Sequence, residues 1–196
     1  MASVSPVAWA MYASEGAWKR SPHLLYLASL LEKLHSGEIR RLCVSMPPRH
    51  GKSELITKYF PTWWLGTRPK ARIVTASYGA ELSKQWSVAG RDLFARFAPE
   101  VFGVSTWARS KGQEWWALDP ESGMRHGGNL YAVGKGGALT GRGAVLLVVD
   151  DLCKDDQDAG SPTLRDHAWK WFLSAAVTRM EPDGAVVVVM TRWHHD

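Results

Sequence analysis

The sequence predicts a three-layer α/β fold in which helices cover both faces of a mostly parallel central sheet. Two runs, residues 144–149 and 185–190, are apolar at every position, which is typical of parallel strands buried on both faces. Other extended runs alternate with segments of helical periodicity, as in folds where helices connect parallel strands. A chain of 196 residues with 45% hydrophobic residues can bury a core, so we expect one domain over residues 1–196.

Composition and charge indicate in which cellular compartment the chain works and which kinds of partner fit it. The formal net charge of +5 fits a polyanionic partner and equally an ordinary basic surface. Cys43, within an apolar run, and Cys153, beside acidic residues, are expected as buried small side chains and not as a disulfide, which suits a reducing compartment. No apolar run approaches membrane-spanning length, and the N-terminus lacks the order of a signal peptide. We therefore expect no membrane contact and a cytoplasmic location.

The N-terminal region is expected to be helical in two parts. Residues 1–20 form a short helical or irregular lead-in, and Ser21 with Pro22 then marks the start of a helix that Gly37 ends. Leucines at helical spacing between these residues predict one buried face. His23, in the first turn, either lies against an adenine ring or is a partly exposed side chain, and the sequence leaves both open.

Residues 41–54, RLCVSMPPRHGKSE, predict a strand, a phosphate-binding loop and the start of a helix. A bound polyphosphate would meet the loop's N–H groups and lysine at the positive end of the helix dipole, and the Ser53 hydroxyl would be a ligand of the accompanying Mg²⁺. Met46 replaces the first glycine of the usual pattern and two prolines follow it, so the later half of the loop must supply the N–H groups. Alone, Gly-Lys-Ser can also be a chance helix start. The candidate nucleotide-binding residues are Arg49, His50, Gly51, Lys52, Ser53 and Glu54.

Two further elements follow the phosphate loop and its helix. Pro61 is expected to break or kink that helix, which makes residues 63–65 a separate last turn. Residues 72–77 predict a second strand, and its polar carboxyl end lies where open α/β sheets bind ligands. Residues 80–97 predict an amphipathic helix. The apolar positions of that helix are Leu82, Trp86, Val88, Leu93 and Phe94.

A hairpin and a glycine-rich loop occupy the middle of the chain. After an irregular stretch at residues 98–112, the runs 114–118 and 129–133 are rich in Trp, Tyr and Leu and predict a β-hairpin. The loop GKGGALTGRG, residues 134–143, comes next. Its place directly before a buried strand favours a functional segment over a linker.

The buried run at residues 144–149 ends in two acids, Asp150 and Asp151. An acid at the carboxyl end of a buried strand, downstream of a phosphate loop, is the Walker B arrangement: Asp150 holds Mg²⁺, and Asp151 orients or deprotonates water. Together the two motifs predict a nucleotide-hydrolysing P-loop NTPase of the additional-strand, catalytic-carboxylate type, with ATP and Mg²⁺ as cofactors. The acidic residues at 155–158 are expected to be a solvated loop.

The last elements predicted are a helix at residues 164–178 and the buried strand at 185–190, which Thr191 follows. Thr191, at the carboxyl end of a third buried strand, is placed to contact the γ-phosphate. We expect this strand to lie between the phosphate-loop strand and the strand that ends at Asp150.

The motifs PPRHGKSE, TASYGAEL, GGALTGRGA, VVDD and TRWHH follow one another in this order. With them the chain resembles the ATPase domain of the large terminase subunit of tailed bacteriophages. The resemblance implies a DNA-packaging motor in the cytoplasm of the infected bacterial host, in which a homo-oligomeric ring of ATPases drives double-stranded DNA through a portal into a procapsid. It also implies the portal protein and the small terminase subunit as partners.

The resemblance implies roles for individual residues. Lys52 and Ser53 bind phosphate and metal, Asp150 is the Mg²⁺ residue and Asp151 is the catalytic carboxylate. Thr191 begins the motif that couples hydrolysis to movement. The candidates for an arginine finger are Arg49, inside the phosphate loop, and Arg142, in a glycine-rich loop that suits insertion into a neighbouring subunit. For Arg142 the alternatives are contact with a DNA phosphate or a pair with a local acid.

Two departures and two alternatives accompany this hypothesis. Many related motors have Glu where Asp151 stands, so the shorter side chain must lie closer to the water or act through another water. Large terminases continue into a ribonuclease H-like nuclease, whereas this sequence stops at Asp196, so we expect a fragment and assign it no nuclease activity. The alternatives are a helicase-like DNA-remodelling ATPase and a non-catalytic module, with a decayed nucleotide site, that docks on DNA or the portal.

Overall fold

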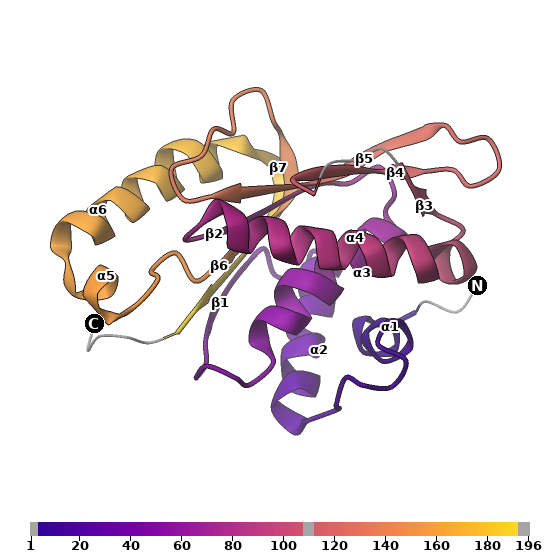
Figure 1. Ribbon diagram of the computed structural model, residues 1–196, viewed down its shortest axis with the longest axis horizontal. Coiled ribbons are helices and arrows are strands. Elements are labelled where there is room, and N and C mark those ends of the chain that lie inside the picture. The colour runs from indigo at the N-terminus through magenta and orange to yellow at the C-terminus, as the bar shows by residue number, and fades with distance from the viewer. Residues whose placement is uncertain (1–3, 108–111, 192–196) are drawn as a thin grey trace.

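A seven-stranded sheet in the order β1-β7-β6-β2-β5-β4-β3 forms the centre of the protein. The computed structural model describes residues 4–107 and 112–191 (Figure 1). Strands β1, β7, β6, β2 and β5 are parallel, and β4 and β3 continue the sheet in antiparallel pairing. The strands are β1 Arg41–Ser45, β2 Arg72–Ser77, β3 Ser105–Thr106, β4 Glu114–Leu118, β5 Arg125–Gly134, β6 Ala144–Asp150 and β7 Met180–Met190.

Helices cover both faces of this sheet, which confirms the predicted three-layer α/β fold (Figure 1). On one face, core residues of α1 to α4 pack against Ile73, Leu146 and Val187. On the other, α6 packs against Val74 and Leu147. These alternating side chains on β2 and β6 put the apolar strands between two cores. The helices are α1 Pro6–Ala13, α2 Pro22–Ser36, η1 Glu54–Tyr59, α3 Phe60–Thr67, α4 Ala80–Phe102, α5 Asp156–Gly160, α6 Pro162–Trp171, η2 Phe172–Ala176 and η3 Val177–Arg179.

The strand order β1-β7-β6 confirms the expectation that the last strand separates the phosphate-loop strand from the strand ending at Asp150. The strands at 72–77 and the hairpin also form as predicted. Helix α2 begins after Ser21 and ends at Gly37, whose φ of 82° is the left-handed conformation that glycine adopts without strain. The acidic segment expected as a loop contains the short helix α5, because the Asp155 carboxylate accepts a hydrogen bond from the Asp158 N–H and caps it.

The long helix α4 differs from its prediction in length and in its buried face. It continues through Pro99 to Phe102, where Gly103 ends it at a φ of 66°. Its buried residues are mostly small, whereas the larger Leu82, Trp86 and Val88 are only half-buried. Small residues allow a close approach: a Cβ on Gly90 would lie 3.2 Å from Cγ2 of Thr62 on α3. The buried residues are Ser83, Ser87, Gly90, Phe94 and Ala98.

The helix after the phosphate loop is not interrupted at Pro61. Residues 54–59 form a π-helical turn, in which the Phe60 N–H bonds the carbonyl of Leu55, and α3 continues from Phe60. In an α-helix the proline ring would clash with the carbonyl of Thr57, four residues earlier. The wider turn relieves that clash, so the helix continues with a change of pitch and not with a break.

Strand β1 is an edge strand, and α6 does not cover it fully. Cys43 on β1 is exposed, contrary to the expectation of burial, while Cys153 is buried as expected. Both cysteines line an apolar groove of about 630 Å³ between β1, β7 and α6, together with residues such as Trp169 and Phe172. Among the described residues no helix is long and apolar enough to cross a membrane.

Candidate functional site

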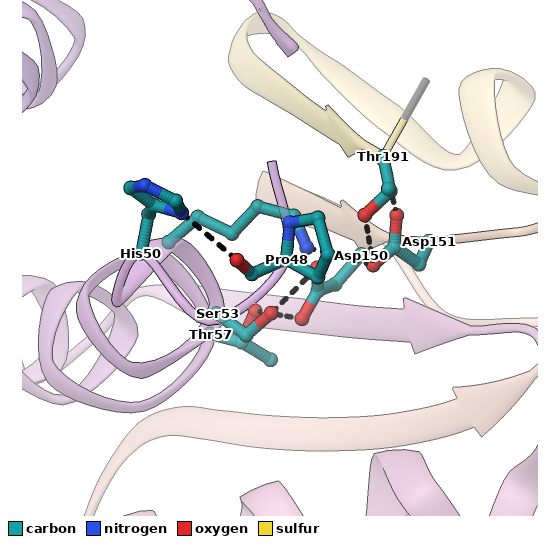
Figure 2. Close-up of polar contacts among 8 residues, drawn as sticks. Pro48, His50, Ser53, Thr57, Asp150, Asp151 and Thr191 are labelled. Carbon is teal, nitrogen blue, oxygen red and sulfur yellow. Dashed lines mark hydrogen bonds and ion pairs between the residues drawn. The ribbon is translucent and has the colours of Figure 1, made fainter. Parts of the chain in front are cut away.

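The carboxyl ends of β1, β6 and β7 bring together residues that are far apart in the sequence (Figure 2). The phosphate loop follows β1, and its start is joined to the end of β7 by a hydrogen bond from the Met46 N–H to the Met190 carbonyl, 3.3 Å. Asp150 ends β6, and Thr191 follows β7. Because all three strands are parallel, their ends lie at one edge of the sheet.

Asp150 is held by two hydroxyls of the phosphate-loop helix. Ser53 Oγ donates to Oδ1 at 3.1 Å, and Thr57 Oγ1 donates to Oδ2 at 2.8 Å (Figure 2). The Asp150 carboxylate is almost fully buried, with 2% of the residue exposed. Burial raises the pKa of Asp150 above its usual value, and the hydrogen bonds from Thr57 and Ser53 oppose that rise by favouring the charged form.

Asp151 has a different set of partners. Lys52 Nζ lies 3.0 Å from its Oδ2, the Thr191 N–H donates to Oδ1 at 2.6 Å, and the Thr191 hydroxyl donates to Oδ2 at 3.3 Å. Lys52 is 6% exposed, so its ammonium needs such a partner. Asp151 has a φ of 48°, an uncommon left-handed conformation that turns its carboxylate toward β7 and away from that of Asp150.

The phosphate loop is bent by left-handed residues and held by histidines. Arg49 has a φ of 62° and Gly51 a φ of 78°. A ring nitrogen of His50 is 2.8 Å from the Pro48 carbonyl, and His23 Nε2 is 3.2 Å from the His50 carbonyl. The two histidine rings lie edge to face at 5.9 Å. The loop is therefore held by a contact within it and by a contact from His23 of α2.

A cavity of about 290 Å³ opens beside the loop. His23 lines it, together with Trp18 and four residues from the predicted phosphate-loop set, Arg49, His50, Gly51 and Glu54. Glu54 also pairs with Lys58 at 2.7 Å. A nucleobase against His23 stays a prediction, and the cavity is where the base would lie.

Arg142 lies apart from this group. Its guanidinium pairs with Glu114 on β4 at 2.8 Å and stacks over the ring of Tyr131 on β5 at 3.8 Å. Glu114 lies on the antiparallel strand β4 and Tyr131 on β5, which pairs with β4, so the structure does not bring Arg142 together with Lys52 and the two acids. Of the TRWHH motif, residues 192–195 lie outside the described part of the chain.

The oxygens of Ser53 and Asp150 fit a magnesium ion. Mg²⁺ prefers hard oxygen ligands and is commonly held by one or two carboxylates together with substrate phosphates. Residues 4–107 and 112–191 contain no group of three His, Cys, Asp or Glu side chains that would form a metal cage. A metal ion here would therefore be held by these two side chains and a nucleotide.

Thr57 is the residue of this site that the sequence analysis did not single out. It is 4% exposed and touches Asp150 directly. The available signal was its spacing, since residues four apart on a helix share a face, which places Thr57 behind Ser53.

Comparison with known proteins agrees with this geometry. The chain is similar in structure to the large terminase ATPase domain of Thermus phage P74-26, with a TM-score of 0.54 and 14% identity over 77% of this chain and 59% of that one. For a mutant of the same domain the TM-score is 0.52 and the identity 13%, over 80% and 61% of the two chains. At such identities the likeness shows the fold alone, and this chain spans about three fifths of the length of those structures. A search of curated protein sequences finds no match.

A family model decides the relationship. The model for the N-terminal part of the terminase large subunit, T4likevirus type, matches residues 43–196. This range includes the phosphate loop, both acids and Thr191, and it covers most of the chain. The protein therefore belongs to the terminase large subunit family, and its sequence corresponds to the N-terminal, ATPase part of that subunit.

Proposed function

We propose that this chain hydrolyses ATP with Mg²⁺ and that hydrolysis drives double-stranded DNA into a procapsid. The observation that carries the proposal is the separation of the two acids. Asp150 faces the hydroxyl of Ser53, whereas Asp151 faces Lys52 and Thr191. A nucleotide hydrolase needs one carboxylate for the metal and another for the attacking water, and this site offers both.

The residues of the loop have separate tasks in this proposal. Ser53 and Asp150 would hold Mg²⁺, which when bound neutralises charge on the phosphates. Lys52 would exchange the Asp151 carboxylate for the γ-phosphate, where its ammonium opposes the charge that develops in the transition state. The loop N–H groups from Arg49 to Ser53 would bind the remaining phosphate oxygens.

Asp151 would act on the water once Lys52 has turned to the phosphate. Its Oδ2 then keeps only the weak contact with the Thr191 hydroxyl, 3.3 Å, and is available to accept a proton from water. The Thr191 N–H keeps Oδ1 in place at 2.6 Å. Thr191 would thus sense the state of Asp151 and pass it to the segment after β7, which is how we place it in the coupling of hydrolysis to movement.

Family membership supports a proposal for the larger assembly. We propose one ATPase domain over residues 1–196 that works in a homo-oligomeric ring in the cytoplasm of the bacterial host. Its partners would be double-stranded DNA, the portal protein and the small terminase subunit. Family membership supports these partners, since the terminase large subunit resemblance implies DNA packaging through a portal.

Phosphate release from ATP, measured with and without Mg²⁺ and duplex DNA, tests the proposal. Lys52→Ala should reduce turnover by about a hundredfold or more, because the transition state loses its nearest fixed cation. The matched control is Lys58→Ala, which removes a lysine of the same helical segment whose ammonium pairs with Glu54. Circular dichroism should show that both variants are folded.

The outcomes separate the candidate functions. Equal turnover in wild type and Lys52→Ala contradicts the role of the phosphate loop. Nucleotide or DNA binding without phosphate release in the wild type favours the docking module. DNA-stimulated hydrolysis accompanied by strand separation favours the helicase-like ATPase.

A further inference from the structure

The hydroxyl of Thr57 makes a hydrogen bond that burial of the side chain does not by itself explain. Its hydroxyl could have bonded a carbonyl of the preceding turn, as those of Thr62 and Thr67 do on the same helical segment. Instead it donates to Oδ2 of Asp150 at 2.8 Å, and both residues are almost fully buried. A hydrogen bond to a charged acceptor in a buried site is stronger than one between neutral groups.

The helical turn that carries Thr57 is π-helical, and Pro61 accounts for it. Pro61 has no N–H, and its ring cannot approach the Thr57 carbonyl in α-helical geometry. The turn at residues 54–59 therefore widens. Such turns frequently occur at functional sites, because they shift the side chains of one turn relative to the rest of the helix. Thr57 lies within this turn, four residues after Ser53.

Ser53 and Thr57 each donate a hydrogen bond to a different oxygen of the Asp150 carboxylate. Ser53 bonds Oδ1, on the side of the phosphate loop, and Thr57 bonds Oδ2, on the side of the helix interior (Figure 2). Thr57 is buried, whereas Ser53 is only half-buried. A metal ion and nucleotide would engage Ser53 first, and Thr57 would keep its bond to Asp150 in the loaded state.

We propose that Thr57 is a positioning residue, whose hydroxyl fixes Oδ2 of Asp150 so that Oδ1 is presented to Ser53 and to magnesium. The inference rests on the proposed function. Thr57 does not itself touch the metal or the nucleotide. Without the Thr57 hydroxyl the carboxylate can rotate about its side-chain bond, and part of the Mg²⁺ affinity is spent on ordering it.

Equilibrium binding of a fluorescent ATP analogue, with excess Mg²⁺ and with EDTA, measures this effect without turnover. Thr57→Val keeps the shape of the side chain and removes the hydroxyl. It should leave affinity in EDTA unchanged and reduce the Mg²⁺-dependent gain in affinity by about tenfold, since residues that orient metal ligands contribute ten- to hundredfold. Thr57→Ser, which restores a hydroxyl, should recover most of the gain.

Thr62→Val is the matched control. Thr62 is fully buried on α3. Its hydroxyl donates to backbone carbonyls and accepts from the indole N–H of Trp9. This variant should lose stability and keep the Mg²⁺-dependent gain. If Thr57→Val does not fold, Thr57→Ala provides the same comparison.

Three results would overturn the inference. A normal Mg²⁺-dependent gain in folded Thr57→Val means that the hydroxyl does not position Asp150. Equal losses with Mg²⁺ and with EDTA mean that Thr57 only supports the fold. A wild-type chain whose nucleotide affinity does not respond to Mg²⁺ contradicts the proposed function, and the positioning role with it.

Discussion

The parallel and antiparallel halves of the sheet treat their charged residues differently. At the carboxyl edge of the parallel strands, Lys52 pairs with Asp151 from a distant part of the sequence. In the antiparallel half, Arg142 pairs with Glu114 of the neighbouring hairpin, and Arg125 packs over Trp107 and Trp116. Parallel strands end together and collect distant side chains at one edge, whereas antiparallel strands pair neighbours. The contacts of Arg142 therefore hold it beside the hairpin, apart from Lys52 and the two acids.

The largest effect on turnover is expected for Arg142, whose side chain would have to leave Glu114 and enter the site of a neighbouring chain. An arginine finger contributes about a thousandfold or more to turnover. The pair with Glu114 is partly exposed, with 35% and 26% of the two side chains accessible, so releasing it costs about 1 kcal/mol or less. Arg142→Ala and Asp151→Asn chains should each be inactive and should recover part of the activity when mixed, as measured by phosphate release.

Recovery requires that some interfaces pair an intact Asp151 with an intact Arg142 from a neighbour. Lys135→Ala is the control, because Lys135 lies in the same glycine-rich loop and pairs with Asp158. It should retain turnover without mixing. Mixtures that stay inactive although co-assembly is confirmed would shift the finger to Arg49 and leave Arg142 as a local partner of Glu114.

The next effect concerns the two acids within the parallel half. Asp151→Asn should reduce turnover by about a hundredfold or more and keep Mg²⁺-dependent nucleotide binding, because the amide cannot accept a proton from water. Asp150→Asn should weaken that binding. Turnover and binding titrations on both variants check this difference, and identical behaviour would show that the two carboxylates share one task.

The order of the strands could be predicted from the sequence, but the contacts between the site residues could not. The expectation that β7 lies between β1 and β6 came from the additional-strand type of P-loop fold, and the observed strand order confirms it. The bonds between Lys52 and Asp151, and between Thr191 and Asp151, could not be predicted. Asp151 has a left-handed φ of 48°, and no residue pattern in the sequence indicates that conformation.

Errors arose where packing decided the outcome. Apolar bulk was a poor guide to the buried face of α4. Of the five predicted positions only Phe94 is buried, and the helix approaches the sheet through Ser83 and Ser87. The Ser83 hydroxyl bonds the Thr75 carbonyl at 3.1 Å, which is a tertiary contact without a local signal. Pro61 was expected to break a helix that instead widened, because the core residues on both sides of it, such as Phe60 and Trp64, hold the segment in place.

The smallest expected effect is on stability and not on turnover. It arises at His35, which packs against α3, the helix that continues from the phosphate loop. His35 packs against Trp63 and Trp64 with ring centroids 4.4 and 4.8 Å away, and its Nε2 lies 3.0 Å from Oγ1 of Thr67. Burial, and then the charge of Arg68, lower the pKa of His35 to about 4 from an ordinary 6.5. The unfolded chain therefore binds more protons between these values, and stability should fall as the pH drops from about 6.5 to about 4.

The expected loss is on the order of 1–2 kcal/mol, because His35 is only partly buried and solvent screens its charge. Urea unfolding at pH 7 and pH 5 measures it. His35→Gln keeps a polar group beside Thr67 and should remove this part of the pH dependence. If the pH dependence of stability persists in that variant, another group is responsible for it. Activities of variants in the parallel and antiparallel halves of the sheet should then be compared at the same folded fraction.

The pairing of β1 with β7 also dictates when the site can form during synthesis. The register joins Arg41 to Val186, so within the described chain the phosphate-loop strand finds its strand partner only after nearly all the intervening residues have been made. Ribosomes add about 5–20 residues per second, which leaves β1 unpaired for several seconds while the central strands β2, β5 and β6 can already assemble. A nascent chain halted before β7 would hold a nearly complete sheet with its nucleotide loop still unanchored. Nucleotide binding should therefore arise in a single late event of biosynthesis.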